Sequence, residues 1–194
     1  MKLSREWLDE FTHITADDRK YCEAMTMSGS KVEGFEVTGA DISGVVAGRV
    51  LSIERHPDSD HMWVCRLDTG DGEPITVVTG AQNVKAGDYV PVALDGATLP
   101  GGVSIRTSVL RGVESRGMLC SLKELGFDTR DFPFAVEDGI FILSGDAPES
   151  EKLFCRPGLD IRKVLGLGDT VVDFEITNNR PDCLSVIGLA RESA

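Results

Sequence analysis

The chain has 194 residues and a formal net charge of −12, with 41% hydrophobic and 27% charged residues. This length accommodates one or two globular domains with hydrophobic cores. The sequence contains no run near the roughly 20 apolar residues of a membrane span, it begins without the pattern of a signal peptide, and its five cysteines are spaced too widely for a zinc ribbon or a disulfide framework.

Residues 1–39 predict two helices and a strand. Ser4 is placed to cap the first helix, and the spacing within Thr15–Asp18 is that of a capping box for the second. The second helix is expected to end near Gly29, and a strand is predicted over Lys31–Val37. A segment this short cannot bury enough surface to fold alone. It therefore needs a partner.

Residues 40–152 contain a series of short strand patterns separated by turns. Five strands are predicted, at Val45–Ile53, Trp63–Leu67, Ile75–Thr79, Tyr89–Leu94 and Val103–Leu110. Pro91 favours an edge position or a bulge in the fourth strand, and Gly139–Leu143 is placed to close the unit. This pattern is typical of a small barrel or sandwich, and a five-stranded barrel is the OB architecture.

Residues 153–194 predict a short helix, a strand and a final helix. The first helix is expected at Ile161–Leu165. The strand Val171–Ile176 alternates apolar and acidic residues, which predicts one buried face and one exposed face. Asp182 is placed to cap the final helix. This segment is also too small to fold alone.

The shortness of both terminal segments predicts that they fold together. We therefore predict an α+β chain in which a five-stranded OB-type β-barrel is inserted into a small discontinuous α+β domain. The barrel domain is expected over residues 40–152. The small domain is expected to comprise residues 1–39 and 153–194.

Three arginines lie in or just before the glycine-containing stretch Leu110–Ser121. Residues 103–123 hold four Lys/Arg against Glu114 alone, whereas residues 40–152 hold 10 Lys/Arg against 18 Asp/Glu. A loop that concentrates cations and exposes glycine amides is suited to an anion such as RNA phosphate. Alternatively, these arginines only offset neighbouring acids. A regular strand would place Arg106 and Arg111 on opposite faces, because one is an even and the other an odd position. A bulge, or a strand that ends before Arg111, is needed for both to contact one ligand.

The remaining reactive side chains do not form a recognisable catalytic or metal-binding pattern. His56–His61 carries two histidines and two aspartates, but Pro57 and the Asx side chains are typical of a turn. Cys65 and Cys120 are flanked by strand-like apolar residues, which predicts buried, inert thiols. We expect no catalytic residue, no metal site and a reduced, cytoplasmic compartment.

Several blocks occur together in an order found in one known family. They are His56–Asp60, Gly80–Val84, Val90–Leu94, Leu99–Gly102 and Leu110–Ser121. These blocks resemble the tRNA-binding OB domain of bacterial phenylalanyl-tRNA synthetase beta chains. The flanks are similar to the same chain: Ser4–Phe11 and Met25–Gly29 to its opening, and Asn179–Ser185 with Gly188–Glu192 to the segment after the OB domain.

The resemblance implies a cytoplasmic enzyme of two alpha and two beta subunits that attaches phenylalanine to its tRNA with ATP and magnesium. It places aminoacylation in the alpha subunit and editing beyond these residues. The chain would then be a non-catalytic N-terminal fragment without a cofactor of its own. Its implied partners are the phenylalanine-specific tRNA and the alpha subunit.

The resemblance places the arginine-bearing stretch in a tRNA-binding domain, and we expect the tRNA contacts there. The expected contacts are Arg111, Ser115, Arg116 and Gly117, with Arg106 and Lys85 as secondary phosphate contacts. The chain departs from the family at His61 and Trp63, where basic residues are common, and at Asn178, where proline is usual. Two alternatives stay open: an assembly scaffold with little RNA contact, and a stand-alone tRNA-binding protein.

Overall fold

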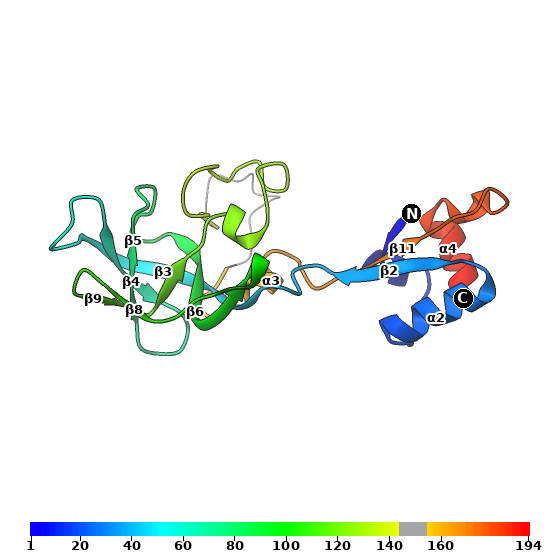
Figure 1. The fold of residues 1–194 in the computed structure, drawn as a ribbon, viewed down its shortest axis with the longest axis horizontal. Helices are drawn as coiled ribbons and strands as arrows, with labels where there is room; N and C mark the ends of the chain where they lie inside the picture. The colour runs from blue at the N-terminus through cyan, green and yellow to red at the C-terminus, as the bar shows by residue number, and fades with distance from the viewer. Residues whose placement is uncertain (144–154) are drawn as a thin grey trace. The chain divides into compact units, whose positions relative to one another are not determined.

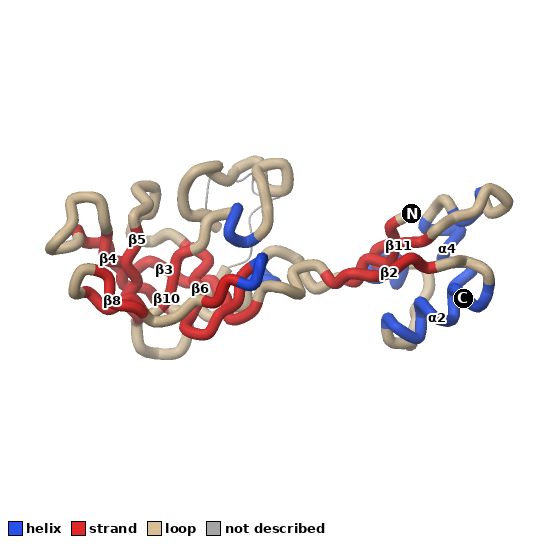
Figure 2. Tube along the Cα trace, viewed as in Figure 1, coloured by secondary structure: helices blue, strands red, loops and turns tan. Residues whose placement is uncertain are grey.

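The computed structural model describes residues 1–143 and 155–194, which form mostly antiparallel sheets with few helices (Figure 1). The chain divides into two compact units, a smaller one of Met1–Ala40 with Leu167–Ala194 and a larger one of Asp41–Gly166. Figure 2 shows that strands provide most of the regular structure in the larger unit. None of the helices in the described ranges is long and apolar enough to cross a membrane.

The smaller unit contains a three-stranded antiparallel sheet covered by helices. Its strands, in spatial order, are β1 (Lys2–Ser4), β11 (Thr170–Phe174) and β2 (Val32–Val37). Its helices are α1 (Arg5–Asp9), α2 (Asp18–Ser28) and α4 (Val186–Ser193), with a 3-10 turn η4 (Pro181–Cys183) before the last. Because the central strand comes from the C-terminal segment, neither terminal segment completes the sheet alone.

The core of this unit lies on one face of β11. Val172 and Phe174 are buried, which confirms the predicted alternation in this strand. The Tyr21 ring of α2 meets the Phe174 ring edge-on at a centroid distance of 6.5 Å. The Tyr21 hydroxyl lies 2.9 Å from the Ser193 hydroxyl of α4. These contacts join α2 and α4 to the same face of the sheet.

The structure confirms one of the three predicted helix caps. The Trp7 N–H donates to the Ser4 hydroxyl at 2.9 Å, so Ser4 caps α1 as predicted. The cap of α2 is Asp17, not Thr15, because Asp17 directly precedes the helix and its carboxylate accepts from the Lys20 N–H at 2.9 Å. Gly29 ends α2 with a φ of 107°, as expected.

The predicted cap of α4 is also wrong. Ser185 caps this helix, since its hydroxyl accepts from the Gly188 N–H at 3.1 Å. Asp182 instead lies in η4 and forms an ion pair with Arg180 at 2.9 Å. The 3-10 turn moves the helix start three residues beyond the position that the sequence spacing suggested.

The Asp17 cap makes the stability of the smaller unit depend on pH. The Lys20 backbone N–H bond to the carboxylate, followed by the Lys20 side chain, holds the pKa of Asp17 below its ordinary value. A lowered folded-state pKa adds stability that is present above the unfolded value near 3.8 and is lost as the pH falls through the folded value. Asp17→Ala should therefore lower the melting temperature at pH 7, with a shrinking difference at more acidic pH. Thr15→Ala should have no such effect, and an equal loss in both variants would contradict this assignment.

The larger unit is built on one main sheet and a separate hairpin. Along its main path the sheet runs β10 (Gly117–Leu119), β6 (Tyr89–Leu99), β3 (Ser43–Arg55), β4 (Trp63–Asp68) and β5 (Ile75–Thr79), with β7 (Val103–Ser104) paired to β6. The hairpin consists of β8 (Ser108–Leu110) and β9 (Val113–Ser115). Short helical turns are η1 (Pro100–Gly102), η2 (Lys123–Leu125) and α3 (Ile161–Val164).

One predicted strand of this unit differs from the structure. The stretch Val103–Leu110 is not continuous, because β7 pairs back to β6 whereas β8 pairs forward to β9. The Ile105 N–H donates to the Ala97 carbonyl at 2.8 Å, after which the chain leaves β6. Gly139–Leu143 is not a strand. This stretch, expected to close the unit, bonds to the sheet through an isolated bridge between Ile140 and Ser121 and through the Leu143 N–H, which donates to the Tyr89 carbonyl at 2.8 Å.

The predicted edge position or bulge at Pro91 is wrong, because β6 lies between β3 and β10 and its register with β3 is unbroken at Pro91. The Cys120 N–H donates to the Pro91 carbonyl at 3.0 Å, but proline has no N–H to return the bond. The Cys120 carbonyl accepts instead from the Phe141 N–H at 3.1 Å. The segment after β10 therefore supplies the donor that allows proline in a central strand.

The boundary predicted between residues 152 and 153 lies outside the described residues, and the larger unit continues beyond it. The Ala47 N–H donates to the Leu159 carbonyl at 2.8 Å, and the Gly158 N–H donates to the Ala47 carbonyl at 2.9 Å. These bonds tie the segment before α3 to β3, so the larger unit extends to Gly166. The sequence shows the helix but not the sheet against which it packs.

Candidate functional site

The arginine-bearing stretch forms a tight hairpin between β8 and β9. Leu110 pairs with Val113, which leaves Arg111 and Gly112 as the two turn residues. Their φ angles are 45° and 86°, the two positive values that a type I′ turn requires. Arg111 is the only non-glycine residue with positive φ in the part of the chain that is described. The turn places its side chain at the exposed tip, and such backbone conformations cluster at functional sites.

A buried histidine holds this hairpin against the turn between β3 and β4. His56 is 3% exposed, and its Nδ1 accepts from the Asp58 N–H at 3.1 Å. The other ring nitrogen, Nε2, therefore carries the proton and donates to the Leu110 carbonyl at 3.0 Å. The Arg111 guanidinium donates to the Asp58 carbonyl at 3.1 Å. The His-Pro motif thus has the structural role predicted for it. No metal-ligating cluster exists within the described ranges.

Ser115 and Gly117 have packing roles in the structure. Ser115 is 1% exposed, and its hydroxyl accepts from the Val78 N–H at 3.0 Å and donates to the Gly117 carbonyl at 2.9 Å. A Cβ at Gly117 would lie 2.4 Å from the Ala93 carbonyl oxygen, so glycine is needed where β10 meets β6. The predicted tRNA contact by the Ser115 hydroxyl is therefore not available at the surface, because the hydroxyl is buried and used internally.

Arg116 lies on an exposed groove beside the hairpin. Its backbone N–H donates to the Thr76 carbonyl at 2.9 Å, and its guanidinium pairs with Glu114 at 3.1 Å. Arg66 of β4 lines the same groove, together with Thr76, Gly112 and Glu114. Two guanidinium groups, one from β4 and one from the residue between β9 and β10, therefore border one opening, and the Glu114 carboxylate partly offsets their charge.

Arg66 was not among the residues that the sequence singled out. The predicted strand Trp63–Leu67 already indicated an exposed side chain at Arg66, which lies between the buried residues Cys65 and Leu67. Its cross-strand partner is Thr76, whose carbonyl accepts from Arg116. Strand alternation alone could have put Arg66 on the surface. Its proximity to Arg116 required the pairing of β5 with the residues after β9.

The two secondary candidates lie apart from this groove. Arg106 is exposed between β7 and β8, next to Thr107, whose N–H donates to the Asp95 carboxylate at 2.6 Å. Lys85 is exposed in the turn between β5 and β6, where its backbone N–H donates to the Asp88 carboxylate at 2.7 Å. Among the described residues, neither side chain forms an ion pair, and no hydrogen bond joins Lys85 to the hairpin.

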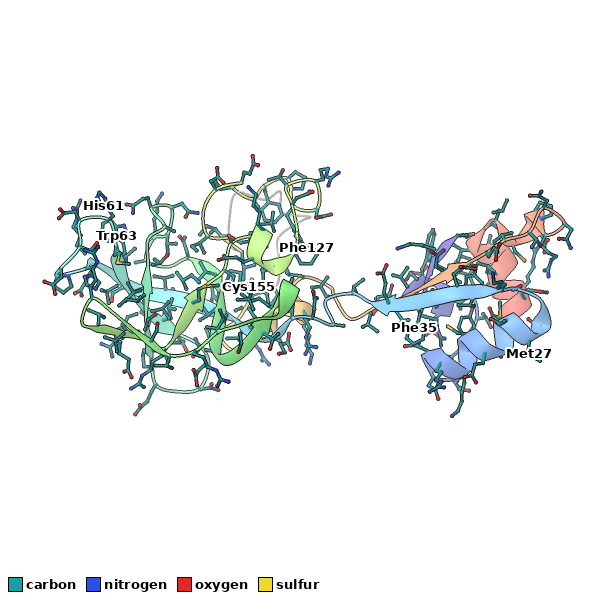
Figure 3. The ribbon with its side chains drawn as sticks, in the orientation of Figure 1. Met27, Phe35, His61, Trp63, Phe127 and Cys155 are labelled. Atoms are coloured by element: carbon teal, nitrogen blue, oxygen red, sulfur yellow. The ribbon has the colours of Figure 1, made fainter. Side chains whose placement is uncertain are left out.

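Trp63 is held in place by its neighbours. Its indole N–H donates to Gln82 at 3.0 Å, and the Arg55 guanidinium lies 5.4 Å from the ring centroid. Gln82 also donates to the His61 carbonyl at 3.2 Å, and Figure 3 shows Trp63 and His61 close to each other. Trp63 therefore packs against the sheet and carries a cation–π partner.

The buried thiols do not offer a nucleophile. Burial raises the pKa of Cys65 to about 11. Burial, with a smaller contribution from Glu124, raises the pKa of Cys120 to about 12. Both thiols are protonated near neutral pH, and the thiolate is the reactive form.

A family model described as "Putative tRNA binding domain" matches residues 45–141, which include the hairpin, the groove and Trp63. Three similar proteins are named "Phenylalanine--tRNA ligase beta subunit". They come from Clostridium acetobutylicum (46% identical), Methylococcus capsulatus (44%) and Staphylococcus aureus strain MRSA252 (43%). Each match covers 100% of this chain but 23% of the relative, so the chain spans about a quarter of the length of these proteins.

Proposed function

The chain belongs to the tRNA-binding domain family, and we propose that it is the N-terminal tRNA-binding part of a phenylalanine–tRNA ligase beta subunit. In this proposal the chain itself is not catalytic and holds no cofactor. The whole enzyme attaches phenylalanine to its tRNA with ATP and magnesium, works with an alpha subunit in a two-alpha two-beta tetramer, and is cytoplasmic. The resemblance of the chain to beta subunits along its full length supports this assignment.

We further propose that the larger unit is an OB-type barrel inserted into the smaller unit. The five-strand path from β10 to β5 supports the architecture. Two bonds near its ends bring β5 to the β9–β10 segment: the Arg116 N–H to the Thr76 carbonyl at 2.9 Å, and the Val78 N–H to the Ser115 hydroxyl at 3.0 Å. These bonds join the two ends of the sheet without a regular ladder.

The proposed tRNA contact is the surface formed by Arg111, Gly112, Arg116 and Arg66, called here the hairpin surface. Guanidinium groups bind phosphate oxygens through several N–H donors, and an exposed glycine amide can add another. Arg106 and Lys85 are assigned to more distant phosphates. Ser115 and Gly117 are assigned a supporting role, because their buried contacts fix the backbone on either side of Arg116. Because the chain carries a net charge of −12, the contact is confined to this local group of cations. Because it consists of cation–phosphate contacts, it weakens as the salt concentration rises.

One observation carries this proposal: the matched family region contains an exposed hairpin whose arginines stand out in an acidic chain. The direct test is a titration of labelled tRNA with the chain at low salt. Arg111→Ala/Arg116→Ala should weaken binding by about tenfold or more, because two charge-assisted phosphate contacts are lost.

The matched control is Arg19→Ala/Lys20→Ala, which removes two exposed cations from α2 in the smaller unit. Its net charge equals that of the hairpin variant, so any general effect of charge appears in both. Equal weakening in the two variants would contradict a local contact. Absence of binding even at low salt would instead favour the assembly-scaffold alternative.

A further inference from the structure

The smaller unit has an open sheet edge. Within the described ranges, β2 pairs with β11 on one side and with no strand on the other. Thr38 bonds toward the β11 side, since its N–H donates to the Asp169 carbonyl at 2.9 Å. Backbone groups in an antiparallel ladder alternate in direction. Val37 and Phe35 therefore direct their N–H groups away from β11, toward the open edge.

An apolar groove borders this edge on the helix side of the sheet. It is a hollow of about 390 Å³ lined largely by apolar atoms, including those of Cys22, Met27, Val32 and Phe35. Met27 is 86% exposed and Phe35 is 45% exposed, although Phe35 pairs with the fully buried Val172. Figure 3 labels Met27 and Phe35 on the elements α2 and β2 that bound this groove. The helix leaves the outer part of β2 uncovered.

The opposite face of the same edge is acidic. Gly34 has open space where a side chain would lie, and a second hollow at this position is bordered by Glu33, Glu36 and Asp173. These carboxylates and Glu175 form ion pairs with Lys2, Lys31 and the amino group of Met1. All four remain about half exposed or more. The unit as a whole carries 7 Lys/Arg and 13 Asp/Glu.

We propose that β2 binds an extended protein segment in which apolar and basic residues alternate. The segment adds a strand to the open edge through the N–H groups of Phe35 and Val37. Side chains of an added strand alternate between the two faces. Its apolar residues therefore enter the groove beside Met27 and Phe35, while its basic residues lie over the acidic face. This binding is independent of the proposed RNA contact.

A second copy of the chain fits this edge less well. In a two-fold antiparallel pairing of β2 the axis must pass through a residue, because opposed residues share the same hydrogen-bonding direction. Centred on Glu36, the pairing would place Glu36 opposite the other copy's Glu36, and like charges directly opposite destabilise a strand pair. The exposed acids of β2 therefore argue against self-pairing. A basic segment removes this repulsion.

The probe for this proposal is a labelled hexapeptide, Lys-Val-Lys-Val-Lys-Val, titrated against the whole chain by fluorescence anisotropy. The matched probe Lys-Lys-Lys-Val-Val-Val has the same composition without the alternation and reports general attraction to an acidic protein. The alternating peptide should bind at least about tenfold more tightly, because only it meets the groove and the acidic face together. Hydrogen exchange should slow at the Phe35 and Val37 amides when it binds.

Two variants separate the edge from the groove. Val37→Pro removes an outward N–H at a position where an edge strand tolerates proline, and Met27→Gln replaces an exposed apolar side chain with a neutral polar one. Each should weaken the alternating peptide about tenfold. The proposal would be overturned if both peptides bound equally well or if neither variant changed the affinity. It would also be overturned if the chain bound no peptide but self-associated through β2, with Val37→Pro abolishing the self-association.

Discussion

Gly117→Ala is expected to destabilise the larger unit by about 3 kcal/mol, because forcing an atom into a filled space strains the backbone around it. The new Cβ would lie 2.4 Å from the Ala93 carbonyl oxygen, which is backbone and cannot rotate away. The Gly117 carbonyl also accepts a hydrogen bond from the Ser115 hydroxyl. A shift of β10 would therefore disturb Ser115 and the neighbouring Arg116.

The measurement is urea unfolding followed by the fluorescence of Trp63, in a Trp7→Phe background. Trp7 lies in the smaller unit and is 53% exposed, so its replacement leaves one reporter in the larger unit. Gly80→Ala is the control, since no atom lies within 4 Å of its Cβ position. A Gly117→Ala variant as stable as Gly80→Ala would refute the close approach of β10 and β6.

Phe141→Ala is expected to cost about 4 kcal/mol, the usual range for truncating a buried phenylalanine. Phe141 is fully buried, with its ring centroid 5.2 Å from that of Phe132 and 6.0 Å from that of Phe134. The same residue donates its N–H to Cys120, opposite Pro91 in β6. Loss of the ring therefore removes the packing that holds this donor in place.

Phe141→Leu is the matched variant, because it keeps most of the buried apolar volume. It should lose less than half as much stability as Phe141→Ala in the same Trp63 unfolding assay. Similar losses in the two variants would mean that the ring is not packed as the structure describes.

The sequence predicted most helices and strands, but it did not tell which of several neighbouring polar residues caps a helix. Alternation located β11 correctly because one face of the strand is buried. The caps of α2 and α4 were misassigned because several Asp, Ser and Thr residues near each helix can accept the same bonds. Spacing alone does not tell which of them adopts the cap conformation.

Long-range pairing explains the remaining differences. The apolar pattern over Val103–Leu110 is the same whether one strand or two are formed, and only the partners β6 and β9 divide it. Because proline lacks an N–H, the sequence predicted an edge position or a bulge for Pro91. Phe141, 50 residues away, supplies the N–H that the Cys120 carbonyl needs. Such compensation depends on the tertiary structure and has no local signal.

The residues of the proposed contact differ in how far the sequence could foresee their surroundings. A local excess of cations marked the hairpin that carries Arg111 and the residue Arg116 that follows it. Ser115 belongs to the same motif, yet the structure buries its hydroxyl between β5 and β10. Arg66 lies far away in sequence and reaches the groove through β4–β5 pairing. Charge composition can find a surface, whereas the contacts that shape it come from the sheet.

The salt dependence of tRNA binding tests the proposed hairpin surface most directly. Affinity for tRNA is measured across a series of salt concentrations for the chain, for Arg111→Ala/Arg116→Ala and for Arg19→Ala/Lys20→Ala. Each lost phosphate contact should reduce the slope of log affinity against log salt by about 1. The proposal predicts a reduction of about 2 in the hairpin variant and an unchanged slope in the control. Identical slopes for the chain and the hairpin variant would contradict it.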